Sequence, residues 1–263
     1  MRMALGFLVV LLTAGTARAD ATALDRRVEA LGRVGYAIGI DGGSPRQVTA
    51  HTDPVSGISW APDGKAIAYS LAPGGGYAAQ VHLVTPHGEW LRRLTAGGEE
   101  NNFAGEFVAD GRYHFRSNRR DPAKIDGWIW DPKSGNAELA VEIDGLGSIS
   151  DLAGTNALVT RFVTRGNANL WLDDLDSKAS ILLTPHEGPA LVEGRFAEDG
   201  RSVYVSHNLE LDDTVFARID VGEDGTVRPP RTLAARPGVQ LDGFELRDDR
   251  RAALLFWNVG GKT

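Results

Sequence analysis

The sequence predicts an all-β fold in which one four-stranded unit recurs along the chain. Three stretches share one pattern: an aromatic residue, two spacers, Asp-Gly, a basic residue, and an apolar run that ends in Ser. They are residues 60–70, 107–117 and 196–206. Altered copies lie at 152–160, with Thr155 in the Asp position, and at 246–256, with Asp249 there and Arg250 replacing the Gly. Successive Asp positions are 47, 45, 44 and 50 residues apart, and a period of about 40–50 residues is typical of propeller blades. We therefore expect a β-propeller of four-stranded blades, with about five blades' worth of sequence.

The Asp-Gly pairs predict the first hairpin of each unit. Gly tolerates a positive φ, and an Asp side chain can accept hydrogen bonds from nearby backbone N–H groups, so the pair favours a tight turn between two apolar runs. A structural role in these turns is predicted for Asp63, Gly64, Asp110, Gly111, Asp199 and Gly200.

The rest of each unit supplies two more strands. A third apolar run and a second polar turn follow the hairpin, for example at residues 81–89 and 128–135. A short fourth run often ends in Leu-Thr, as at residues 94–95 and 183–184. Four strands make one blade, and a blade must stack on its neighbours to bury both faces. This explains the nearly continuous apolar run at residues 253–256.

The repeats define the expected domain organisation. The propeller spans residues 36–263 and follows a lead-in segment at 20–35, in which residues 21–33 have helical periodicity. The repeat units lie near residues 56–95, 105–141, 148–184, 192–233 and 239–258, with residues 36–49 as a half blade.

Two arrangements fit these ends. Either the terminal halves join, so that four whole blades and one composite blade close a five-bladed ring, or the chain is a truncated piece of a longer propeller. We favour truncation because residues 260–263 resemble a turn into a further strand. Truncation predicts exposed strand edges and a tendency to aggregate.

The N-terminus predicts export. Arg2 supplies a positive charge, residues 4–14 are a short apolar run, and residues 17–19 fit a small-x-small cleavage pattern. We expect residues 1–19 to be a signal peptide, cleaved between Ala19 and Asp20, that is too short to span a membrane. The expected location is periplasmic or secreted, with no membrane span after cleavage.

Composition excludes several kinds of function. The formal net charge is −7, and loss of two arginines with the signal peptide makes it more negative. An acidic chain lacks the basic surface that nucleic-acid binding requires. The chain has no cysteine, which excludes disulfides, thiolate catalysis and cysteine zinc sites. The six histidines show no ligand spacing. We expect no metal ion and no cofactor.

The repeats resemble the TolB-type propeller repeat, and in particular the propeller of the prolyl-oligopeptidase family in its dipeptidyl aminopeptidase/acylaminoacyl peptidase branch. The resemblance covers residues 36–263 and is carried by residues 59–65, 110–120, 199–201 and 244–260. Members of that family carry a C-terminal α/β-hydrolase domain with a Gly-x-Ser-x-Gly nucleophile. This sequence has neither the motif nor room for the domain, so no catalytic residue is carried over.

Three functions are then open. The resemblance implies the non-catalytic propeller of an exported serine peptidase, which gates or positions peptide for a missing hydrolase domain. The second is a stand-alone TolB-like scaffold that binds an envelope protein. The third, an enzyme with a site in the central channel, would need a periodic set of inward carboxylates or histidines that the sequence lacks.

Two acidic groups are candidate sites. Glu99 and Glu100 lie on an expected inter-blade loop, where paired carboxylates could bind the amino terminus of a peptide. The alternative is a solvated acidic turn. Asp173, Asp174 and Asp176 could bind a cation, but we expect a solvated blade turn there.

Overall fold

The computed structural model describes residues 27–31, 34–39, 42–247 and 249–261. The predicted signal peptide and its cleavage site lie outside the described residues. The chain divides between Ala140 and Val141 into two compact units. In the described parts, no helix is long and apolar enough to cross a membrane.

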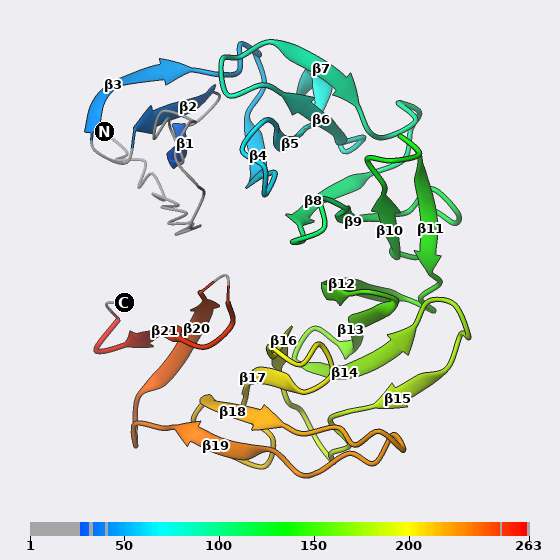
Figure 1. Ribbon diagram of the computed structural model, residues 1–263, viewed down its shortest axis with the longest axis vertical. Coiled ribbons are helices and arrows are strands. Elements are labelled where there is room, and N and C mark those ends of the chain that lie inside the picture. The colour runs from blue at the N-terminus through cyan, green and yellow to red at the C-terminus, as the bar shows by residue number, and fades with distance from the viewer. Residues whose placement is uncertain (1–26, 32–33, 40–41, 248, 262–263) are drawn as a thin grey trace. The chain divides into compact units, whose positions relative to one another are not determined.

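The first unit contains three antiparallel sheets, labelled in Figure 1. The first sheet has the order β1-β2-β3, from β1 (Arg27–Leu31), β2 (Val34–Gly39) and β3 (Gly42–Gln47). The second consists of β4 (Val55–Trp60), β5 (Ile67–Leu71), β6 (Gln80–Val84) and β7 (Trp90–Arg93), with the short 3-10 helix η1 (Pro73–Gly75) after β5. The third consists of β8 (Asn102–Phe107), β9 (Tyr113–Ser117), β10 (Asp126–Trp130) and β11 (Ala137–Val141).

The helix expected over residues 21–33 is wrong where the structure describes it. Arg27–Leu31 form β1, which pairs antiparallel with β2, so that Arg27 lies opposite Ile38. A helix this short is marginal in water, whereas the edge of β2 satisfies the backbone hydrogen bonds of the segment. The predicted half blade therefore has a third strand.

The second unit contains two four-stranded sheets and a hairpin. The first sheet consists of β12 (Leu146–Ala153), β13 (Asn156–Thr164), β14 (Asn167–Asp174) and β15 (Ser180–Leu182). The second consists of β16 (Val192–Phe196), β17 (Val203–His207), β18 (Val215–Ile219) and β19 (Arg231–Ala234). The hairpin is formed by β20 (Gln240–Leu246) and β21 (Ala253–Asn258). The all-β class and the four-stranded antiparallel blades are confirmed.

Neighbouring sheets bury both faces of the inner strands. In the first unit, Ile67 packs in a core shared with β2, whereas the next residue, Ala68, packs in a core shared with β9 and β10. In the second unit, Phe216 packs with β20, whereas Ala217 packs in the core between the two four-stranded sheets. Successive side chains of a strand point to opposite faces, so a strand between two cores is apolar at every position.

Candidate functional site

The Asp-Gly pairs form the turns between the first two strands of their sheets. In each, the Asp side chain accepts a hydrogen bond from the N–H two residues later, and the Gly has a positive φ. The acceptor distances are 3.0, 3.0 and 2.9 Å at Asp63, Asp110 and Asp199. The φ angles of Gly64, Gly111 and Gly200 are 71°, 89° and 64°. The three aspartates shape the turns through side-chain hydrogen bonds to the backbone, and the three glycines through their positive φ.

Hydrogen bonds within the turn lower the pKa of the aspartate in two of these turns. Burial alone would raise the pKa of Asp110, but bonds from the side chain and backbone of Arg112 outweigh it and lower this pKa. At Asp199, burial is outweighed by bonds from Arg201 and Ser202, so its pKa is also lowered. Both carboxylates are therefore held charged by the turn.

The altered copies behave differently from each other. At the third repeat the loop has two residues, Gly154 and Thr155, between the paired Ala153 and Asn156. The assignment of Thr155 to the Asp position is wrong, because this hairpin is shorter than those of the clear copies. In its two-residue loop the residue with the positive φ, 61°, is Gly154, which precedes Thr155.

At the last repeat the turn keeps the Asp geometry. Asp249 accepts a bond from Arg251 N at 3.0 Å. Arg250 takes the Gly position with a φ of 57°, a conformation that is costly for a residue with a side chain.

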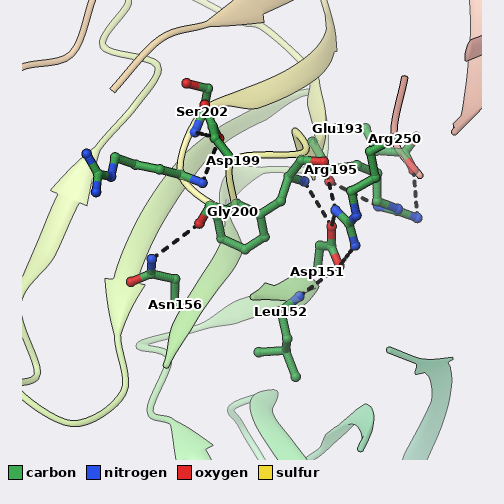
Figure 2. A network of polar contacts seen from close by, with 12 residues as sticks. Asp151, Leu152, Asn156, Glu193, Arg195, Asp199, Gly200, Ser202 and Arg250 are labelled. Atoms are coloured by element: carbon green, nitrogen blue, oxygen red, sulfur yellow. Dashed lines mark hydrogen bonds and ion pairs between the residues drawn. The ribbon is translucent and has the colours of Figure 1, made fainter. Parts of the chain in front are cut away.

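The Arg250 side chain joins three sheets of the second unit (Figure 2). Its Nη1 lies 2.5 Å from Oδ2 of Asp151 on β12 and 2.7 Å from the carbonyl oxygen of Phe196 at the end of β16. The Asp151 side chain is 5% exposed and also accepts bonds from the N–H groups of Phe196 and Leu152. The sequence pattern marked Arg250 as a departure from the repeat, but gave no sign of its distant partner.

Glu99 and Glu100 lie in the loop between β7 and β8 but differ in environment. Glu99 is exposed, whereas Glu100 is half-buried and its Oε1 accepts a bond from Gly97 N at 3.0 Å. The loop is held by Gln80 on β6, whose Oε1 accepts from Gly97 N at 3.0 Å and whose Nε2 donates to the carbonyl of Glu100 at 3.2 Å. One carboxylate therefore takes part in the turn, and the other faces solvent.

Sequence reasoning did not identify a group in the first unit in which two half-buried histidines pack against the buried Tyr69. His51 Nε2 lies 2.6 Å from the Tyr69 hydroxyl, and the Tyr69 and His82 rings stack with centroids 5.5 Å apart. Neither ring nitrogen of His82 has a hydrogen-bond partner among the described residues. Burial, with the charges of His51 and Arg93, lowers the pKa of His82 to about 4. His82 is thus a neutral, half-buried side chain that stacks on Tyr69. The signal that the sequence offered for it was its place in an apolar run predicted to be a strand.

The three aspartates at the β14–β15 turn do not converge. Asp173 pairs with Arg161 on β13, and the Asp174 carboxylate accepts bonds from the N–H groups of Asp176 and Ser177 at 3.0 and 2.7 Å. Among the described residues, no three His, Cys, Asp or Glu side chains lie close enough to hold a metal ion.

Exposed apolar side chains gather at one end of the second unit, where β12, β14 and β16 begin. We call this surface the apolar end; it comprises Leu146, Phe162, Val163, Leu191 and Leu211, which are 53%, 36%, 66%, 48% and 45% exposed. Contiguous exposed apolar side chains on a globular protein often mark an interaction surface.

Comparison with known proteins identifies the fold and no more. No family model and no curated protein matches the chain. The structure is similar to a TolB protein of Agrobacterium tumefaciens, with a TM-score of 0.52 and 16% identity over 76% of this chain and 74% of that one. It is also similar to a prolyl endopeptidase, with a TM-score of 0.59 and 15% identity over 81% of this chain. The chain spans 34% of the length of that endopeptidase.

A third structure shows how widely the fold is used. The hydrazine synthase of Kuenenia stuttgartiensis matches with a TM-score of 0.60 and 12% identity over 95% of this chain and 78% of that one. The chain therefore has the fold of TolB-type propellers and of the propellers of prolyl oligopeptidases. Proteins with such different names share it, so function must be argued from surfaces rather than from fold.

Proposed function

We propose that the chain is a non-catalytic, exported β-propeller that binds polypeptide. In the form we favour, it is the propeller portion of a prolyl-oligopeptidase-like serine peptidase and gates or positions peptide for an α/β-hydrolase domain. The observation that carries this proposal is the fold shared with a prolyl endopeptidase over 81% of this chain but 34% of the endopeptidase. The sequence motifs of residues 59–65 and 110–120 support the same assignment.

The experiment that tests the peptidase setting is to read the gene downstream of the Thr263 codon. A frame that continues into further blades and a Gly-x-Ser-x-Gly segment supports the proposal. A stop codon, together with detection of the short protein in cells, would overturn it. In either case the purified chain should not react with a fluorophosphonate serine-hydrolase probe.

Within this setting, the loop of Glu99 and Glu100 is the proposed contact for a peptide amino terminus. Because Glu100 also closes its own turn, Glu99 is the carboxylate that is free to meet a ligand. Glu99→Gln should weaken binding of a peptide with a free amino terminus but not of its acetylated form. Equal binding by the wild type and Glu99→Gln would reject this contact.

A second candidate function is a stand-alone, TolB-like scaffold for an envelope protein in the periplasm. The apolar end of the second unit favours it, because these large side chains are exposed to solvent although the cores beneath them are closed. Capture of a specific envelope protein by the purified chain would support this function. The absence of any specific capture at micromolar concentration would count against it.

A further inference from the structure

The apolar end is bordered by acidic side chains. We propose that it binds a segment of a partner polypeptide in which basic side chains lie next to apolar ones. The inference deepens the proposed binding function and rests on it. It is carried by the placement of the exposed apolar side chains at one end of two packed blades and by the charge of the loops at that end.

The first part of the surface is a cross-strand pair. Leu146 at the start of β12 lies opposite Phe162 near the end of β13, and Val163 follows Phe162. Opposite residues on neighbouring strands have adjacent side chains on the same face. Leu146 and Phe162 therefore lie side by side on one face, at the end of the blade.

Strand pairing and hydrogen bonds connect this pair to the next sheet. Phe162 is paired with Ala168 on β14, and Ala168 N donates to the carbonyl of Ala190 at 2.8 Å. The next residue, Leu191, donates its N–H to Asn208 Oδ1 at 2.8 Å.

The same asparagine extends the surface to Leu211. The Leu211 N–H donates to the carbonyl of Asn208 at 3.1 Å, which closes the turn after β17. The five apolar side chains thus belong to one end of two packed blades.

The sheets beneath this surface are tightly packed. Leu158, Leu170 and Val205, from β13, β14 and β17, are fully buried in the core between the two blades. A surface held on packed strands loses little conformational freedom when a ligand binds, which favours affinity.

The charge around the apolar end selects the partner. Exposed acidic residues occupy the loops at this end: Glu142, Asp144, Glu187, Glu210 and Asp212. The basic residues of the loops at this end are Arg165, between β13 and β14, and Arg236, between β19 and β20, so negative charge is in excess. Complementary charge steers encounter and excludes like-charged partners. A cationic, apolar segment fits this surface, whereas a second copy of this acidic chain is disfavoured.

The test is a titration of the full chain against three short labelled peptides, followed by fluorescence anisotropy. One peptide combines Leu and Lys, the second Leu and Glu, and the third Ser and Lys. The Leu-Lys peptide should bind roughly tenfold or more tightly than either control. Its affinity should fall with added salt, because salt screens exposed charges.

Variants assign the binding to this surface. Phe162→Ser combined with Val163→Ser should weaken Leu-Lys binding about tenfold, whereas Leu233→Ser on β19, a side chain 40% exposed, should not. Glu187→Lys combined with Asp212→Lys should weaken it similarly, whereas Glu223→Lys, at a side chain 92% exposed in the β18–β19 loop, should not. If the Phe162→Ser, Val163→Ser protein does not fold, the Glu187→Lys, Asp212→Lys protein still tests whether binding occurs at this surface.

Several results would overturn the inference. They are equal binding of all three peptides, no binding of the Leu-Lys peptide, or an affinity that falls as much in the control variants Leu233→Ser and Glu223→Lys as in the variants of the apolar end. A dimer in sedimentation that Phe162→Ser dissociates would instead make a second copy the occupant. If the chain captures an envelope protein and these variants do not reduce that capture, the proposed binding function stands, but the apolar end is not the binding surface.

Discussion

Removal of the Arg250 guanidinium tests how the second unit is held together. The Asp151 carboxylate that it contacts is 5% exposed, and the two remaining donors to that carboxylate are backbone N–H groups. Breaking a buried ion pair by removing one partner costs about 3–5 kcal/mol. Because the Arg250 side chain is one quarter exposed, we place the cost of Arg250→Ala near the lower bound, at about 3 kcal/mol.

Arg250→Gly separates the ion pair from the backbone conformation. Gly adopts the φ of 57° without strain, which should recover about 1 kcal/mol, so this variant should be destabilised by about 2 kcal/mol. The assay is urea unfolding followed by far- and near-UV circular dichroism. Arg251→Ala, at an exposed position in the same turn, is the control and should change the free energy of unfolding by less than about 0.5 kcal/mol.

A double-mutant cycle with Asp151→Asn completes the test. If Arg250 acts through Asp151, Arg250→Ala should cost much less in the Asp151→Asn background than in the wild type. Equal costs in the two backgrounds, or an Arg250→Gly protein as stable as the wild type, would refute the reasoning.

Three further predictions concern the first unit. Stability should fall as the pH is lowered from about 6.5 to about 4, because in that window the unfolded state protonates His82 while the folded state, with its pKa of about 4, does not; His82→Phe should flatten a plot of Tm against pH there. Gly57→Ala should destabilise the protein by more than about 2 kcal/mol in urea unfolding, because its Cβ would lie 2.0 Å from Ala104 Cβ, whereas Gly64→Ala, with a similar φ and nothing within 4 Å, should cost about 1 kcal/mol; equal losses would show that the contact yields. Glu100→Ala should cost about 1 kcal/mol through the lost bond to Gly97, and Glu99→Ala should leave the urea midpoint unchanged; the reverse order would contradict the turn geometry.

The sequence predicted what local chemistry determines. Asp-Gly at residues 63–64 is enough to predict a turn, because both residues act on their own backbone. The apolar runs predicted strands buried on two faces, as Ile67 and Ala68 show. The period predicted the four-stranded unit that the structure contains.

What the sequence could not predict depends on distant partners. Strand β1 forms because β2 offers a backbone edge, which the helical spacing of its apolar residues does not reveal. Arg250 appears in the sequence as a defect in a repeat, and its contact is 99 residues away. The apolar end is assembled from four loops and strand ends, and no single stretch of sequence has an unusual composition.

Polypeptide binding without hydrolysis is the central claim, and one titration tests it directly. The full chain is titrated with the labelled Leu-Lys peptide, and the mass of the peptide is recorded at the end. We predict saturable binding, weakened by Phe162→Ser with Val163→Ser, and a peptide of unchanged mass. A flat titration would contradict binding at this surface, and a cleaved peptide would contradict the non-catalytic role.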